Sequence, residues 1–311
     1  MSPAVRRSGL GARILDHRWH YLFLLPMLVL FAMFTLWPMI ASWYYAFFDW
    51  DGVGSPTDWV GWQNFVDVAS NPVFWRSFKN SFLFSLVALV VQMPLSLLFA
   101  ILLNNPRLRG RSLFRLLLFV PVVTTTAVIG IVLAVILDAS GGTANEILGL
   151  VGVGPFNFLG SEAMALPTLM VIETWKGFGI TLIYWLAALQ TVPTELYEAA
   201  RTDGAGGFQQ LLHVTVPVII PIAIVILVLT FQSSMNPFDL IQATTRGGPN
   251  LSTDVTATFI YRYAFDPGEE GLLAPRLGYA SAAGVIFGVA TLMLTLLQAP
   301  LLRGRYGKKA R

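Results

Sequence analysis

Two charged residues stand close together inside a long apolar stretch of this sequence. Glu173 and Lys176 are three residues apart, so a helix would place both side chains on one face, where they can pair and neutralise each other. Trp175 and Gly177 beside them can supply an aromatic face and a close approach of the backbone. Because charged groups in hydrocarbon are costly, we expect these residues to face a protein interior or a water-filled path.

Uncharged polar residues form a second group near the end of another apolar stretch. These residues are Gln232, Ser233, Ser234 and Asn236, directly before Pro237. Amides and hydroxyls suit a ligand rich in OH groups, such as a sugar, while an aromatic ring stacks on the apolar face of such a ligand. The same types also join membrane helices by hydrogen bonds. The pattern therefore leaves two interpretations open, a ligand path or interhelical bonding alone.

A short polar segment between two long apolar stretches forms a third group. Its members are Glu198, Ala199, Ala200, Asp203, Gly204 and Ala205, with Pro217 downstream. Ala is the best helix former and acidic residues favour a first helical turn, so the segment predicts a short helix. Gly204 then allows a sharp bend that other residues resist.

Several kinds of chemistry are excluded by residues that the sequence lacks. It has no cysteine, which excludes disulfides and cysteine nucleophiles. Its single Gly-Lys pair, Gly307 and Lys308, is followed by Lys309 rather than Ser or Thr, so it has no Walker A phosphate loop. The three histidines lack carboxylates at metal-ligand spacing. We expect a non-catalytic chain that binds neither cofactor nor metal.

The elements that position these groups are apolar helices. With 55% hydrophobic and 12% charged residues and a mean hydropathy of +0.66, the chain has too little polar surface for a soluble globule. Six stretches are long enough to cross a bilayer of about 30 Å. We therefore predict an all-α integral membrane protein with six transmembrane helices near residues 21–48, 81–103, 116–137, 165–190, 216–235 and 279–302. The TRGGP run at residues 245–249 reads as a turn in an outer loop.

The basic residues predict the orientation. Successive loops between the predicted spans lie on alternate sides of the membrane. Counted in this way, fourteen Lys and Arg residues fall on one side and five on the other, and Lys176 lies inside a span. The side with fourteen should be cytoplasmic. Both termini and the segment 195–217 then face the cytoplasm. Membrane topology also explains the basic residues behind the pI near 9.3, so binding of nucleic acid is not needed to explain it.

The polar segment resembles the coupling segment of ABC importer permeases, which reads Glu-Ala-Ala, two variable residues, Asp-Gly-Ala, and here is EAARTDGAGGFQQLLHVTVP. Further stretches follow in the order of the sugar-permease branch, to which the maltose importer's membrane subunits belong. They include FLLPMLVLFAMFTLWPMIASWYYAFFDWD, VGWQNF, ETWKGFGITLIYWLAALQTVPTELYEAARTDGA, FDLIQATTRGGP and LGYASAAGVIF. Together they cover nearly the whole chain.

This resemblance implies a type I importer permease in the bacterial cytoplasmic membrane, multi-pass, whose residues 198–204 couple to the ATPase. The implied domains are a cytoplasmic segment 1–20, a permease domain 21–302 with coupling segment 195–217, and a basic tail 303–311. The implied partners are a second permease, two cytoplasmic ATPase subunits that bind ATP and Mg, an extracytoplasmic sugar-binding protein, the sugar and the lipid bilayer. Positions matching sugar contacts of the maltose type are Trp175, Lys176, Gly177, Ile180, Thr230, Ser233, Ser234, Asn236 and Pro237.

Two other functions are compatible with a polar membrane interior. A secondary transporter would carry its own ion site and commonly two repeated halves, and no repeat is evident here. A membrane scaffold for an ATPase, with no transport role, would not need buried polar residues.

Overall fold

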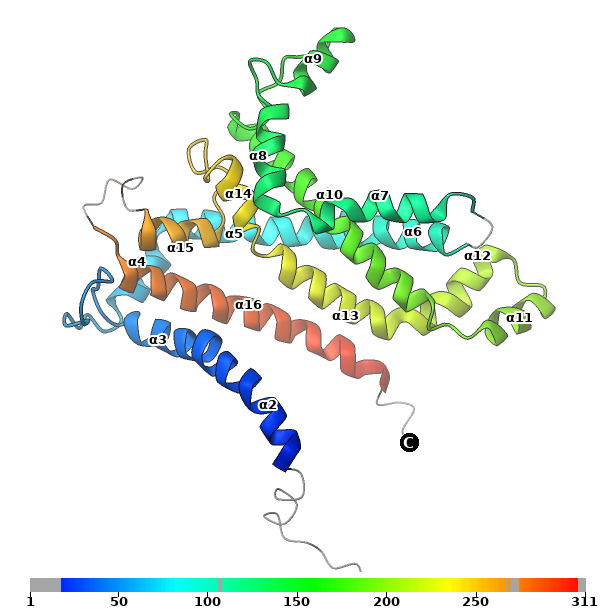
Figure 1. Ribbon diagram of the computed structural model, residues 1–311, viewed down its shortest axis with the longest axis horizontal. Coiled ribbons are helices and arrows are strands. Elements are labelled where there is room, and N and C mark those ends of the chain that lie inside the picture. Colours follow the sequence, from blue (N-terminus) through cyan, green and yellow to red (C-terminus); the bar gives the residue numbers. More distant parts are fainter. Residues whose placement is uncertain (1–17, 106–107, 267, 269–273, 307–311) are drawn as a thin grey trace, which may run out of the picture.

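The computed structural model describes residues 18–105, 108–266, 268 and 274–306, and over these residues the chain is almost entirely helical (Figure 1). The expected cytoplasmic segment 1–20 and basic tail 303–311 lie mostly outside the described residues. A single isolated β-bridge joins Phe48 and Trp59. The α-helices are α2 (Arg18–Phe31), α3 (Trp37–Tyr45), α4 (Gln63–Ser70), α5 (Pro72–Val87), α6 (Met93–Asn104), α7 (Arg111–Val123), α8 (Thr126–Ile136), α9 (Thr143–Leu150), α10 (Glu162–Leu189), α11 (Thr194–Thr202), α12 (Gly207–Gln210), α13 (Val216–Ser234), α14 (Phe238–Thr244), α15 (Thr256–Phe265) and α16 (Leu277–Tyr306).

Among the described residues, four helical stretches are long and apolar enough to cross a membrane. They are Tyr21–Tyr45, Pro72–Asn104, Gly207–Thr244 and Leu277–Gln298, and α7 with α8 makes a fifth span if the bent pair counts as one. α10 is long enough but less apolar, because Glu173 and Lys176 lie within it. An all-helical membrane protein is confirmed, while the number of six spans stays a prediction.

The third predicted span is not a continuous helix. α7 and α8 meet at an angle of 99°. Thr124 and Thr125 between them have extended backbone, with ψ of 138° and 139°. Pro121 lacks an N–H for the last turns of α7, and the β-branched threonines that follow favour extended backbone, which together explain the break.

Three short π-helical segments interrupt the long helices, and each directly precedes an X-Pro pair. They are η1 (Ala32–Leu36) before Pro38, η2 (Ala88–Gln92) before Pro94 and η3 (Leu211–Thr215) before Pro217. A proline inside a helix leaves the carbonyl four residues earlier without its usual donor, and its ring pushes that turn open. Such π-bulges often occur at functional sites.

The buried core comprises three apolar clusters. One lies between α6, α10 and α13 and includes Trp185 and Ile219. The second joins α4, α5, α15 and α16 around Phe74 and Phe259. The third packs α8 and α14 against α5 and α10 around Leu169. α5 and α10 each belong to two clusters, so these two helices connect the separate parts of the core.

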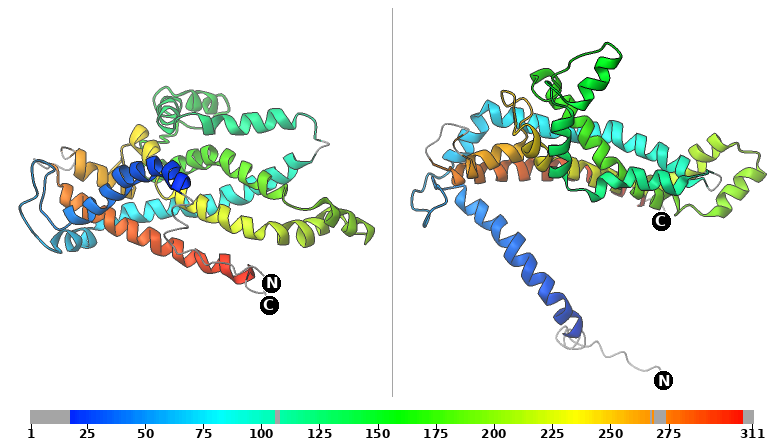
Figure 2. Two further views of the ribbon diagram at one scale, coloured as in Figure 1. Left: turned by 60° about the horizontal axis from the view of Figure 1, so that its bottom comes forward. Right: turned by 45° about the horizontal axis from the view of Figure 1, so that its top comes forward.

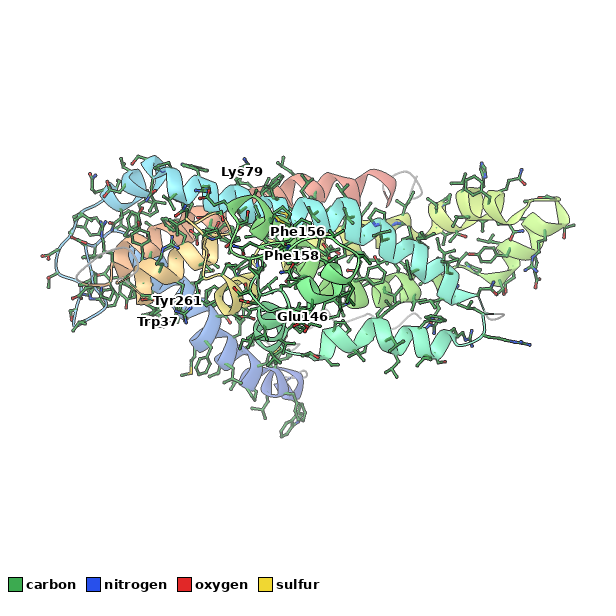
Figure 3. The ribbon with its side chains drawn as sticks, turned by 90° about the horizontal axis from the view of Figure 1, so that it is seen from above. Trp37, Lys79, Glu146, Phe156, Phe158 and Tyr261 are labelled. Carbon is green, nitrogen blue, oxygen red and sulfur yellow. The ribbon has the colours of Figure 1, made fainter. Side chains whose placement is uncertain are left out.

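Two parts of the chain extend away from this bundle. α2 diverges from α16 in every view, and no residue of Tyr21–Tyr45 is buried (Figures 1 and 2). α8 and α9 rise away from the long helices (Figure 1). From above, Phe156 and Phe158 lie side by side after α9, with 5.7 Å between ring centroids (Figure 3).

The bundle has two distinct ends. The end of α6 and the start of α7 lie with α11 and α12 at one end, and α4 and α15 lie at the other (Figure 1). The predicted spans likewise require these two groups of segments to lie at opposite ends of the bundle.

Candidate functional site

A cavity of about 290 Å³ lies where α10, α13, α14 and η2 meet beside the break between α7 and α8. Six residues of the two polar groups singled out from the sequence line it, although one group lies in α10 and the other at the end of α13. The six residues are Glu173, Lys176, Gly177, Ser233, Ser234 and Asn236. The fold therefore joins two groups that the sequence separates by more than fifty residues.

Interrupted helices form three walls of this cavity. Gln92 is the last residue of η2, Thr126 is the first of α8, and Asn236 and Pro237 separate α13 from α14. In membrane proteins, irregular backbone is tolerated where it is enclosed by protein or lines a polar cavity. Discontinuous helices near the bilayer midplane commonly form the ligand sites of transporters.

The cavity holds two carboxylates and one ammonium, from Glu173, Asp239 and Lys176. The expected ion pair between Glu173 and Lys176 is wrong, because no N–O distance between them falls within 4.0 Å. Instead, Oε2 of Glu173 is buried without a hydrogen-bond partner among the described residues, and Lys176 and Asp239 act on it electrostatically. The turns of α10 direct the two side chains into a shared space rather than at each other, so Glu173 keeps an unsatisfied acceptor beside the cavity.

The side chain of Gln92 in η2 fills the space beside Gly177 of α10. A Cβ atom at this position would lie 2.8 Å from Nε2 of Gln92, closer than real contacts allow. Without it, Gln92 inserts beside α10 and donates a 2.7 Å hydrogen bond from Nε2 to Oγ1 of Thr181. The close approach suggested by the sequence is thus present, and its partner is a protein amide.

Three predicted substrate-pathway residues do not line the cavity. Trp175 is 50% exposed and lines an apolar hollow on another face of α10. Gln232 is exposed and accepts a 3.5 Å hydrogen bond from Thr295. Thr230 is buried, and its hydroxyl has no partner among the described residues. Helical periodicity explains the split, since neighbours in a helix point about 100° apart.

Sequence reasoning missed three polar residues that line the cavity: Gln92, Thr126 and Asp239. A signal existed for two of them. Gln92 is a lone amide in an apolar run shortly before Pro94, and Asp239 follows Pro237 at a helix start. No sequence signal indicated Thr126, because its position beside the cavity depends on the break between α7 and α8.

The polar segment between the apolar spans folds as predicted, as a short helix that ends in a sharp turn. α11 ends at Thr202, and Gly204 has φ of +81°, a left-handed conformation that glycine adopts without strain. The N–H groups of Gly204 and Ala205 donate to the carbonyls of Arg201 and Ala200, at 3.0 and 2.8 Å. These two bonds are the Schellman pattern, which satisfies the last carbonyls of a helix.

This turn is exposed at one end of the molecule (Figure 1). Glu198, Ala199, Asp203 and Gly204 are exposed, and Ala200 and Ala205 are partly buried. Beside them Phe208 is 71% exposed, which is unusual for a large apolar side chain on a polar segment. The turn is built on a rigid cap and leaves its outer surface free.

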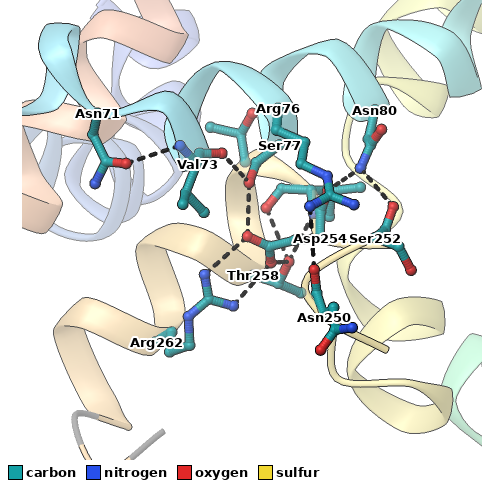
Figure 4. A network of polar contacts seen from close by, with 12 residues as sticks. Asn71, Val73, Arg76, Ser77, Asn80, Asn250, Ser252, Asp254, Thr258 and Arg262 are labelled. Atoms are coloured by element: carbon teal, nitrogen blue, oxygen red, sulfur yellow. Dashed lines mark hydrogen bonds and ion pairs between the residues drawn. The ribbon is translucent and has the colours of Figure 1, made fainter. Parts of the chain in front are cut away.

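A buried ion pair fixes the loop that the sequence presented only as a turn. Arg262 in α15 forms a two-pronged contact with Asp254, at 3.1 and 2.9 Å, and neither side chain is more than 2% exposed (Figure 4). Ser77 in α5 and Thr258 donate to the same carboxylate at 2.7 and 2.6 Å. Asn80 in α5 donates to the carbonyls of Ser252 and Asp254 (Figure 4). The loop is therefore anchored to two helices.

No cluster of three or more His, Cys, Asp or Glu residues suits a metal ion in the part of the chain that the structure describes. The two candidate functional features in these residues are the small cavity, which holds charges of both signs, and the capped turn after α11 at one end of the bundle.

Residues 92–305 match the model of a protein family described as the binding-protein-dependent transport system inner membrane component. This range contains α10, α11 and every residue given above as lining the cavity. The chain belongs to this family. It is therefore an inner membrane component of a transport system that works with a binding protein.

Individual relatives cover most of this permease. The probable ABC transporter permease protein YurN of Bacillus subtilis is 31% identical over 89% of this chain and 94% of its own length. The arabinooligosaccharides transport system permease protein AraP of the same organism is 30% identical over 90% of this chain and 87% of its own. The lactose transport system permease protein LacF of Rhizobium radiobacter is 27% identical over 89% of this chain and 92% of its own length.

A solved structure confirms the importer permease fold. A chain of a bacterial ABC transporter that imports the acidic polysaccharide alginate superposes with a TM-score of 0.82 and 26% identity, covering 96% of this permease and 99% of that chain. A second structure shows the alginate transporter with an oligosaccharide-bound periplasmic protein, with a TM-score of 0.80 and 27% identity.

Proposed function

We propose that this permease is the non-catalytic, pore-forming subunit of an ATP-driven importer that takes a sugar from a binding protein. The sugar-transporting relatives support the substrate class, and the cavity supplies amides and hydroxyls suited to it. A di- or oligosaccharide, or a derivative of one, fits the substrates in the relatives' names. ATP and Mg belong to separate ATPase subunits in this proposal.

The exposed turn at the end of α11 is the observation that carries the coupling role. Glu198, Ala199 and Ala200 lie on α11, Asp203 caps its end and Gly204 forms the turn. Apart from the two neighbours of Gly204, no described residue lies within 4 Å of a Cβ built at that position. A short, rigid, protruding helix suits insertion into a groove of a partner protein, because it loses little conformational entropy on binding. Movement of the ATPase pair would then move this turn.

The orientation and the partners complete the proposal. We place α11, the turn between α6 and α7, and both termini on the cytoplasmic side, as the basic residues predict. A cavity lined by charged and polar groups suits a pathway shared with a second homologous permease subunit. We propose six spans for each permease, with α10 as the fourth and the bent pair α7 and α8 as the third.

A crosslinking experiment tests the coupling role. Because the chain has no cysteine, Ala199→Cys provides a single thiol on the exposed face of α11. With the second permease and the ATPase co-expressed, this thiol should crosslink to an ATPase subunit, and vesicles should take up radiolabelled arabinooligosaccharides, lactose or maltose only with ATP and the binding protein. Ser55→Cys, exposed near the opposite end, is the matched control and should give no ATPase adduct. Uptake by the purified chain alone would overturn the proposal.

A further inference from the structure

One side-chain hydrogen bond connects α11 with the segment that leads into α13. The hydroxyl of Tyr197 lies 2.8 Å from Oγ1 of Thr215, eighteen residues further along the chain. Thr215 is 4% exposed and is the last residue of η3. The ring of Tyr197 packs on the apolar cluster between α6, α10 and α13. The contact is therefore internal, and Thr215 lies out of reach of a docked partner.

A second hydrogen bond closes the segment between these two residues. Nε2 of Gln210 donates to the carbonyl of Ala205 at 2.8 Å, while the backbone carbonyl of Gln210 accepts from Oγ1 of Thr215 at 3.4 Å. The Gly204 turn, α12 and η3 are thus linked in a ring that Tyr197 completes. A closed ring of bonds transmits displacement better than an open loop, because its parts cannot move independently.

α13 then leads from this ring to the cavity. Its 19 residues span about 28 Å at 1.5 Å per residue. It begins directly after Thr215 and ends at Ser234, with Ser233 and Ser234 lining the cavity. One element therefore has the Tyr197 contact at one end and the cavity at the other.

We propose that the hydrogen bond between Tyr197 and Thr215 transmits movement of α11 into α13, and so couples ATP hydrolysis to rearrangement of the cavity. The inference rests on the proposed coupling role of α11. Tyr197 and Thr215 are positioning residues, since neither lines the cavity. Without this bond α11 can still dock, but its movement is absorbed in the segment 203–215, and ATP is hydrolysed with less movement at the cavity.

Thr215→Val tests this role, because it removes one hydroxyl and keeps the shape of the side chain. The reporter is Ser233→Cys, the only thiol in the chain, in the complete complex with the second permease and both ATPases. Its rate of modification by a maleimide is measured without nucleotide and after trapping with ATP, Mg²⁺ and vanadate. Trapping should change this rate in the otherwise unaltered chain. In Thr215→Val the change should shrink by about fivefold, the factor expected from one hydrogen bond.

Three companion variants make the result decisive. Tyr197→Phe removes only the Tyr197–Thr215 bond, whereas Thr215→Val also removes the longer 3.4 Å bond to the carbonyl of Gln210. Tyr197→Phe should therefore reproduce most of the effect of Thr215→Val, and the double variant should add little to it. Thr215→Ser keeps the hydroxyl and should restore the change. Tyr184→Phe removes a hydroxyl from the same apolar cluster and should behave as the unaltered chain.

The possible failures are distinguishable. An unaltered trapping response in Thr215→Val would overturn the inference while leaving the coupling role intact. Loss of the Ala199→Cys crosslink in Thr215→Val would also overturn it, because the bond would then only hold the shape of α11. Absence of that crosslink in the otherwise unaltered chain would instead overturn the proposed function.

Discussion

At the scale of single residues, Gly204 has the clearest backbone requirement in the coupling segment. Its φ of +81° allows two hydrogen bonds that end α11 and turn the chain toward α12. Among the described residues, none beyond its chain neighbours crowds the position, so the constraint there is the backbone angle. The residue can therefore be tested without a steric side effect inside the chain.

We expect Gly204→Val to weaken binding of the ATPase. A β-branched residue in the left-handed conformation costs about 1–2 kcal/mol, which corresponds to about tenfold weaker association if the turn must form to dock. Co-purification of the ATPase with the permease measures this. Gly204→Asn should retain more binding, because asparagine tolerates the left-handed region. Gly207→Val, which introduces the same side chain at an exposed glycine without positive φ, is the control.

The Asp254 carboxylate should contribute more to stability than any exposed acidic residue. Asp254→Asn removes the carboxylate charge that contacts the buried Arg262 guanidinium, and breaking a buried pair in this way costs about 3–5 kcal/mol. We expect a lower unfolding temperature in detergent and greater protease sensitivity of the loop at residues 245–255. Asp58→Asn, an exposed change of the same kind, should alter neither. Equal effects of both changes would show that the ion pair does not hold the loop.

At the scale of elements, the wall of the cavity between η2 and α10 depends on the Gln92 side chain. Gln92 occupies the space that a side chain at Gly177 would need, and its amide bonds to Thr181 one turn further along α10. The π-helical turn that ends at Gln92 also sets the direction of this amide, since a π-bulge rotates the residues that follow it.

Gly177→Ala should therefore disturb the cavity without disturbing the helix. Overpacking against the buried Gln92 costs about 1–3 kcal/mol. We expect reduced sugar uptake by the reconstituted complex, while basal ATP hydrolysis persists. Gly149→Ala, in a helix with open space around the new methyl group, is the control and should be neutral or slightly stabilising. An equal loss of uptake in the control would argue against a specific contact.

At the scale of the whole molecule, the two ends of the bundle should face opposite sides of the membrane. Ser55→Cys and Ser112→Cys are similar exposed changes, one between α3 and α4 and the other at the start of α7. In intact cells, a membrane-impermeant thiol reagent should label only Ser55→Cys, and permeabilisation should expose Ser112→Cys. Labelling of Ser112→Cys from outside would reverse the proposed orientation.

Much of this molecule was predictable from the order of its residues. The all-helical membrane class depends on composition, and the turn after α11 depends on six neighbouring residues, because a helix cap is a local interaction. The likeness of the coupling segment to ABC importer permeases indicated the family, which the match over residues 92–305 confirmed. About half of the residues that line the cavity were also predictable, because polar residues in membrane helices are expected to face the protein interior.

Contacts between distant segments decided the rest. Only the tertiary structure brings α10 to the end of α13, directs Trp175 away from the cavity and leaves Glu173 without its expected partner. Ser77 meets Asp254 across 177 residues, a pairing that no local pattern indicates. Composition is a property of the sequence itself, and a helix cap depends on residues within one or two helical turns. Both can therefore be predicted from the sequence. The face that a helix turns toward its neighbours depends on how all the helices pack together.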